Sequence, residues 1–220
     1  IKYLLKMSEE FIREVDEELK EEKYIKLWKK IGPYVISFAV GIILFTTGFV
    51  GWNGFVEKKK QRLGDDFTSA VNLIKDKDID TALFALEKIT DEASDGYVTM
   101  AKMKKASILI SQEKVEEGLG IYLDLEVSAI DQSFKDIATI LYVLNAMDYK
   151  APEILLKKIE RLTVNNPWKF SALELTGFLH VKNNDISKAN EVFNRILEQT
   201  NAPATLSGRA RDMLEYLKGN

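Results

Sequence analysis

The stretch that decides the fold of most of this chain is GFLHVKNNDISKANEVFNRI, residues 177–196. Gly177 and Ala189 are 12 residues apart, and Phe193 and Ile196 follow Ala189 at intervals of four and then three residues. The polar run KNND between the two small residues is typical of a turn. The pattern therefore predicts two helices that fold back on each other and cross where the facing side chains are small.

The same spacing occurs twice more toward the N-terminus. The two further sets are Ala70, Ala82, Leu86 and Ile89, and Ala106, Gly118, Tyr122 and Leu125. The first small residues of the three sets are separated by 36 and then by 71 residues, which is two steps of about 35.5. This interval leaves room for one more unit near residues 141–154, where the small residues are missing, so that unit is expected to be degenerate.

A period near 34 residues with small residues at a helix crossing resembles tetratricopeptide repeats. We therefore expect an all-α fold in which an α-solenoid of about four hairpins follows an N-terminal transmembrane helix. The expected hairpins span residues 60–92, 95–127, 131–164 and 167–200, and a helix over 204–218 caps the stack. The predicted packing residues are Ala70, Ala82, Ala106, Gly118, Gly177 and Ala189.

An uncharged run of 26 residues, Ile31 to Val56, lies between basic flanks. A bilayer core of about 30 Å needs about 20 apolar residues, so this run predicts a transmembrane helix, with Gly32-Pro33 expected in its first turn. A buried core helix and a cleaved signal peptide fit less well, because the run is too long and lies behind a charged segment. We expect an uncleaved signal anchor.

This anchor predicts three parts. Residues 1–30 form a cytoplasmic amphipathic segment, 31–56 the transmembrane helix, and 57–220 a periplasmic repeat domain. Five lysines shortly before the span against four Lys or Arg after it favour a cytoplasmic N-terminus only weakly. Met7 followed by Ser8 is typical of a natural start, which would make residues 1–6 an upstream extension.

Small residues recur along the predicted span. They are Ser37, Gly41, Gly48 and Gly51. Such residues let a second helix approach closely, although glycine is common in membrane helices in general. Contact with another membrane helix and simple spanning both remain open.

The residues that catalysis and metal binding need are scarce. The chain has no cysteine and one histidine, His180, which is expected to face a hairpin contact or solvent. A Ser/His/Asp triad, a thiolate zinc site and a multi-histidine metal site therefore have no supporting pattern. The part after the span is nearly neutral, which does not favour nucleic acid. We expect no enzyme activity, no cofactor and no metal.

The whole chain also resembles a known family. The segment SEEFIREVDEELKEEKYIKLWKKIGPYVISFAVG, the span, the repeats and NPWKFSALELTGF are similar to the bacterial YfgM-like membrane-anchored tetratricopeptide-repeat proteins, over residues 8 to about 217. This resemblance implies an inner-membrane protein associated with the Sec translocon and with periplasmic chaperones that handle exported proteins.

Two functions remain in play. One is an adaptor that presents its repeat surface to a polypeptide at the translocon, and the other is a scaffold for an envelope or cell-division complex. In repeat solenoids the first helices of successive hairpins line a concave face. On the predicted register their polar residues are Asn72, Lys75, Lys102, Lys105, Lys135, Asn145, Lys169 and Glu174. A polypeptide docked on these residues and recruitment through the span alone are the alternatives.

Overall fold

The computed structural model describes the backbone of residues 2–92 and 96–219 and the side chains of residues 23–92 and 96–219. The described chain is helical throughout, without a strand, so the predicted all-α fold is confirmed. It divides into two compact units, Ile1–Lys59 and Lys60–Asn220. Helix α1 (Lys2–Lys75) contributes to both units, and all later helices belong to the second.

The first unit consists of α1 alone and contains the predicted span. By length and composition, one helix in the described part of the chain could cross a membrane, and none of its most apolar window is buried. Thr46 and Thr47 donate their hydroxyls to the carbonyls of Ile42 and Ile43, at 2.8 and 2.7 Å. These bonds satisfy the hydroxyl groups within the helix, as an apolar surrounding requires.

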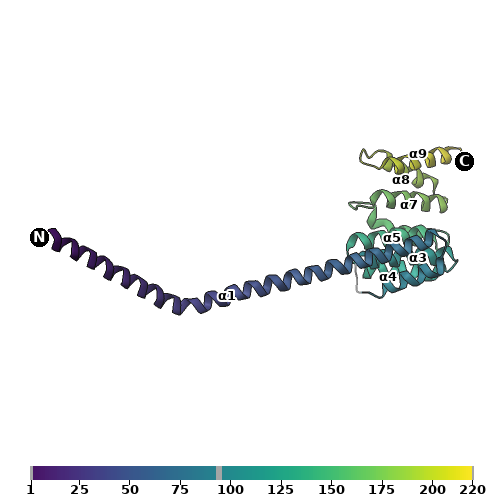
Figure 1. Cartoon of the computed structure of the whole chain (residues 1–220). Coiled ribbons are helices and arrows are strands. Elements are labelled where there is room, and N and C mark those ends of the chain that lie inside the picture. The colour runs from purple at the N-terminus through teal and green to yellow at the C-terminus, as the bar shows by residue number, and fades with distance from the viewer. Residues whose placement is uncertain (1, 93–95, 220) are drawn as a thin grey trace. The chain divides into compact units, whose positions relative to one another are not determined.

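The prediction that Gly32-Pro33 opens a helix is wrong, because Pro33 lies in the interior of α1. A proline inside a helix removes one hydrogen bond and crowds the preceding turn, which bends the helix when the flanking residues favour helix on both sides. Figure 1 shows a bend in the N-terminal half of α1.

The second unit is a series of antiparallel helices. After the end of α1 come α2 (Ile79–Thr90), α3 (Gly96–Ser111), α4 (Val115–Ser128), α5 (Gln132–Ala146), α6 (Pro152–Ile159), the 3-10 turn η1 (Glu160–Leu162), α7 (Lys169–Lys182), α8 (Ile186–Leu197) and α9 (Ala204–Lys218). From α2 onward consecutive helices pack against each other, and the end of α1 shares a hydrophobic cluster with α2 and α3. The four predicted hairpins and the capping helix are therefore present as a solenoid.

Three of the hairpins close with the same turn. Lys77, Glu113 and Asn184, which are 36 and 71 residues apart, each adopt a left-handed backbone with φ of 63°, 66° and 57°. The next amide of each turn donates back to the carbonyl five residues earlier, as Asp78 does to Leu73 at 2.9 Å. This arrangement satisfies the free carbonyls at the end of a first helix and reverses the chain.

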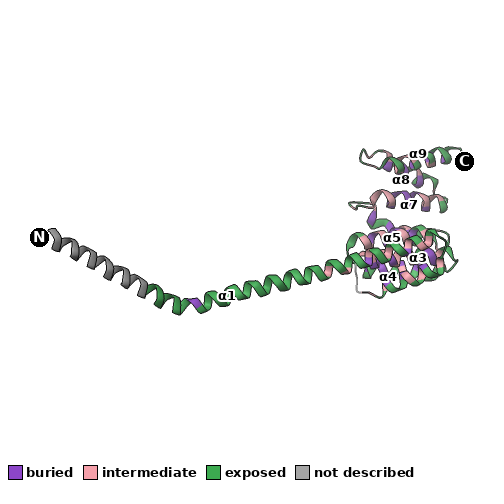
Figure 2. Cartoon of the chain, in the orientation of Figure 1, coloured by how far each residue is buried: buried purple, intermediate pink, exposed green. Residues whose placement is uncertain are grey.

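The predicted packing residues all lie in the interior. Ala70, Ala82, Ala106 and Ala189 are fully buried, and Gly118 and Gly177 are also buried. Figure 2 shows buried residues along the helices of the second unit. A Cβ atom on Gly118 would lie 2.7 Å from the carbonyl oxygen of Ala106 on α3. At Gly177 a Cβ atom would lie 2.5 Å from the ring of Phe193 on α8. These two distances leave no room for a larger residue unless the helices move apart.

The third hairpin keeps the spacing but not the small residues. Leu155, Ile159 and Leu162 are fully buried and follow one another at intervals of four and three residues, like the buried set of each other hairpin. Leu155 therefore occupies the position that Gly118 and Ala189 hold in the neighbouring units. This is the degenerate unit that the sequence predicts.

Candidate protein-binding surface

The polar residues predicted to line one concave face differ in their surroundings. Asn72 and Lys75 are exposed at the end of α1, and Lys135 on α5 is half-buried. These three side chains have no hydrogen-bond or ion-pair partner among the described residues. They are the members of the predicted set that could offer a free polar group to another molecule.

Lys102 and Lys105 come together on α3 and pair with acidic residues of the helices on either side. The Lys102 ammonium lies 3.1 Å from Asp124 Oδ2 on α4, and Lys105 forms an ion pair with Glu87 on α2. Burial raises the pKa of the Asp124 carboxyl, but hydrogen bonds from Lys102 and Ser128 have the larger combined effect and hold this pKa below its usual value. Both lysines therefore lie between α2 and α4, which are the second helices of the first and second hairpins.

These two lysines line a groove, which we call the α2–α4 groove. Its other lining residues are Thr90, Leu109, Glu117, Gly120, Ile121 and Asp124. The floor is apolar at Leu109 and Ile121, while the rim carries both signs of charge. Such a groove can hold a side chain or an extended segment of another polypeptide.

The groove recurs along the solenoid at the repeat spacing. Between α6 and α8 a second groove is lined by Leu173, Thr176, His180, Lys188, Glu191, Val192 and Arg195, each 71 residues after a residue of the α2–α4 groove. A third, between α1 and α2, is lined by Asp66, Ser69, Thr81, Phe84, Ala85 and Lys88, each 36 residues before one. The sequence reasoning missed these grooves, although the repeat period alone places their residues in register.

Glu174 and Lys169 hold the C-terminal helices together. Glu174 is 8% exposed and accepts two hydrogen bonds from the guanidinium of Arg209 on α9, at 2.5 and 2.7 Å. The hydrogen bonds that Arg209 donates to Glu174 raise the pKa of the Arg209 guanidinium. Lys169 donates to Gln199, and its ammonium lies 5.0 Å from the centre of the Phe170 ring. Both charged groups are thus already engaged within the solenoid.

Asn145 is likewise satisfied within its own helix. It is half-buried, and its amide nitrogen donates to the carbonyl of Leu141 at 2.7 Å. This bond uses one of the two N–H donors of the amide and leaves the other donor and the amide oxygen. The eight predicted residues therefore comprise three with free side chains, two that line the α2–α4 groove, and three that are bonded within or between helices.

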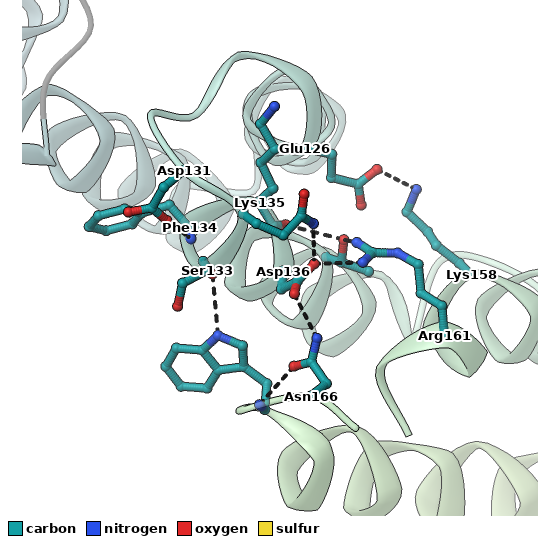
Figure 3. Close-up of polar contacts among 12 residues, drawn as sticks. Glu126, Asp131, Ser133, Phe134, Lys135, Asp136, Lys158, Arg161 and Asn166 are labelled. Atoms are coloured by element: carbon teal, nitrogen blue, oxygen red, sulfur yellow. Dashed lines mark hydrogen bonds and ion pairs between the residues drawn. The ribbon is translucent and has the colours of Figure 1, made fainter. Parts of the chain in front are cut away.

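A buried carboxylate that the sequence reasoning missed organises the middle of the domain. Asp136 on α5 is 3% exposed and accepts hydrogen bonds from Gln132 at 2.8 Å, Arg161 at 2.6 Å and Asn166 at 2.6 Å (Figure 3). Burial raises the pKa of Asp136, but these three bonds lower it to below its usual value. An aspartate within the apolar run DIATILYVL was the available signal.

The same region ties the connection before α7 to α5. The indole nitrogen of Trp168 donates to the carbonyl of Ser133 at 3.2 Å, and the backbone amide of Trp168 donates to the side-chain oxygen of Asn166 at 2.8 Å. Figure 3 shows Asn166 reaching Asp136 of α5 from this connection. The cluster satisfies its own polar groups and so serves the structure.

His180 is mostly buried beside the α6–α8 groove. Its Nδ1 atom lies 4.0 Å from Asp185 Oδ2, and burial lowers the pKa of the imidazole. Within the described residues, no group of three or more His, Asp and Glu side chains could hold a metal ion.

The small residues of the predicted span face open space in this chain. Ser37, Gly41, Gly48 and Gly51 are exposed, and a Cβ atom on any of these glycines would meet no heavy atom within 4 Å. A second helix could therefore approach there without a clash. That such a helix does so stays a prediction.

Comparison with known proteins gives one family. The tetratricopeptide repeat-like domain matches residues 26–215, which include the apolar part of α1 and the helices that follow. The comparisons with curated proteins and with solved structures give no match. Repeats of this family are typically non-catalytic scaffolds for protein–protein interaction.

Proposed function

Because the chain belongs to the tetratricopeptide repeat-like domain family, we propose that it is a non-enzymatic, membrane-anchored adaptor that binds other proteins. The observation that carries this proposal is the extent of the family match, residues 26–215. The match covers both the apolar helix and the solenoid. Membrane attachment and a repeat surface then belong to the same function.

The proposed site of action is the Sec translocon, where the protein links the translocon to periplasmic chaperones for exported proteins. This part of the proposal rests on the resemblance of residues 8–217 to the YfgM-like proteins. The anchor would lie in the bacterial inner membrane with the N-terminus in the cytoplasm and residues 57–220 in the periplasm. In that place the solenoid meets polypeptides as they leave the membrane.

The surface offered to a polypeptide combines free polar groups with shallow grooves. Asn72, Lys75 and Lys135 supply unpaired donors, and Lys102 and Lys105 line the α2–α4 groove. An incoming segment must compete with the ion pairs that these two lysines already make. Binding is therefore weak. It weakens further with salt, because ions screen exposed charges and the screening length is about 8 Å at physiological ionic strength.

Topology is tested first, because every later step depends on it. Reporter domains that are active only in the periplasm, fused after Val56 and after the last residue, should both be active. The matched control is the same reporter fused before Lys23, which should be silent. The orientation would be overturned if reporters that are active only in the cytoplasm gave a signal when fused after Val56 and after the last residue.

The partner is tested by site-specific photocrosslinking in cells. Crosslinkers at Lys102, Lys135 and Lys169 should give adducts with translocon subunits, chaperones or exported chains. A crosslinker at Tyr216, which is 60% exposed on α9 and lines none of the three grooves, is the matched control. A further crosslinker is placed at Gly41 in the span. If adducts form only from this position, the anchor and not the solenoid is the binding element. Adducts with cell-wall or division proteins would replace the translocon role by the scaffold role.

A further inference from the structure

The part of α1 just before Pro33 has two chemically different sides. Its sequence is KYIKLWKKI, residues 23–31, and every one of these side chains is exposed. At about 100° per residue, the four lysines, Lys23, Lys26, Lys29 and Lys30, fall within an arc of about 120°. The five apolar residues occupy the opposite arc of about 160°. A helix with these two sides is suited to the boundary between water and lipid.

The apolar side is large and has no cover among the residues whose side chains the structure describes. Tyr24, Ile25, Leu27, Trp28 and Ile31 are between 44% and 71% exposed. A contiguous group of this kind, which includes two aromatic residues, marks a contact surface for an apolar partner. Tyrosine and tryptophan also favour the headgroup level of a bilayer, where an apolar ring and a polar tip are both satisfied.

The span does not need these residues. Tyr34 to Val56 is a run of 23 uncharged residues, which at about 1.5 Å per residue reaches about 35 Å and exceeds a hydrocarbon core of about 30 Å. Pro33 lies between this run and the two-sided segment, inside α1. A proline in that place is where a helix can change direction. The two-sided segment can therefore leave the direction of the span.

We propose that residues 23–31 form a surface helix that lies in the plane of the membrane on anionic lipid. The apolar arc enters the boundary with the acyl chains, the four lysines contact phosphate-bearing headgroups, and Gly32-Pro33 is the turn into the span. Charge complementarity and direct continuity with the span select lipid as the occupant of this face. The proposal rests on the membrane anchoring proposed above and adds a lipid-binding site to it.

A straight α1 would place the same segment in water. Five large apolar side chains would then project from the membrane without cover, and the lysines would lose contact with the headgroups because a helix of nine residues extends about 14 Å. The attraction of each lysine to an anionic surface is equivalent to about a fivefold preference. The in-plane arrangement uses both sides of the helix.

The test is spin-label accessibility in the full chain, which contains no native cysteine. Single cysteines replace Tyr24, Lys26, Leu27 and Lys29 in turn, and the protein is reconstituted in nanodiscs of phosphatidylcholine with or without phosphatidylglycerol. Collision rates are measured with oxygen, which partitions into lipid, and with a water-soluble nickel chelate. A label at Phe45 reports separately on the anchor.

In the anionic nanodiscs, labels at Tyr24 and Leu27 should collide mainly with oxygen and labels at Lys26 and Lys29 mainly with nickel. The contrast should fall at least severalfold in pure phosphatidylcholine, and also in the Lys23→Gln/Lys30→Gln variant. The matched control, Lys58→Gln/Lys60→Gln, removes the same charge on the other side of the span and should leave the contrast intact.

Three results would overturn the proposal. Nickel access at all four positions would place the segment in water, and oxygen access at all four would place it within the span. A contrast that is equal with and without anionic lipid would remove the headgroup site. Nickel access at Phe45 would instead refute the membrane anchor itself.

Discussion

The close approach of α3 and α4 at Gly118 makes a sharp prediction. Replacing Gly118 by alanine places a Cβ atom 2.7 Å from the carbonyl oxygen of Ala106 and 2.5 Å from Cγ1 of Ile110. The isoleucine side chain can rotate, but the carbonyl oxygen belongs to the backbone of α3. An ordinary contact therefore requires the two helices to separate by several tenths of an ångström.

Gly120 provides the matched control on the same helix. A Cβ atom at Gly120 meets no heavy atom within 4 Å. Replacing glycine by alanine within a helix stabilises it by about 0.5 to 1 kcal/mol, because the unfolded chain loses freedom. Overpacking costs about 1 to 3 kcal/mol. Gly120→Ala should therefore raise the free energy of unfolding. The free energy of unfolding of Gly118→Ala should be lower than that of Gly120→Ala by about 1 to 3 kcal/mol.

The assay is urea unfolding of residues 60–220 followed by circular dichroism. This fragment is suitable because the hydrophobic clusters of the solenoid, from Leu63 to Leu217, all lie within it. For a domain of this size, 1 kcal/mol corresponds to about 2 to 4 °C in the melting midpoint, so thermal unfolding gives an independent reading. Equal midpoints for the two alanine variants would refute the close crossing at Gly118.

Three further variants test other contacts by the same assay. In the folded protein the pKa of the Asp136 carboxyl is lowered, so its contribution to the free energy of unfolding is present above its unfolded pKa of about 4. That contribution is lost as the pH falls through the folded pKa. Asp136→Asn should therefore make the free energy of unfolding depend less on pH in acid. Arg209→Ala should cost about 1 to 3 kcal/mol by leaving the buried carboxylate of Glu174 unpaired, and Arg209→Met with Glu174→Met should recover most of it. Gly177→Ala should destabilise through its 2.5 Å approach to the ring of Phe193, and Phe193→Leu in the same chain should reduce that penalty.

The sequence predicts the solenoid well where the packing needs a particular residue size. Two helices that cross closely require alanine or glycine, and this requirement leaves a visible mark at Ala106 and Gly118. The turns are also visible, because the residue that takes a left-handed backbone is followed by a polar residue such as Asp78 or Asp185, which caps the next helix. Size and capping are local properties, so a single sequence contains them.

The candidate surface is less predictable because it depends on which side chains meet across helices. Polarity places Lys105 and Glu174 on first helices, but it does not reveal that Lys105 pairs with α2 or that Glu174 is buried against α9. Long side chains choose their partners after the helices have packed. The helix start at Gly32-Pro33 was mispredicted because proline is tolerated in a first turn but does not require one, and α1 continues on both sides of Pro33.

The third hairpin shows how the solenoid continues without a small residue at the crossing. Leu155 stands where its neighbours have glycine or alanine, and α6 is correspondingly short before it tightens into η1. Polar contacts hold this segment instead: Lys158 on α6 lies 2.7 Å from Glu126 of the preceding hairpin, and Arg161 in η1 lies 2.6 Å from the buried Asp136 on α5 of the same hairpin. We infer that these charges fix the position of α6, because hydrogen bonds at a buried carboxylate tolerate few alternative arrangements whereas apolar contacts tolerate many. A repeat that loses its packing residue can in this way keep its place in the stack.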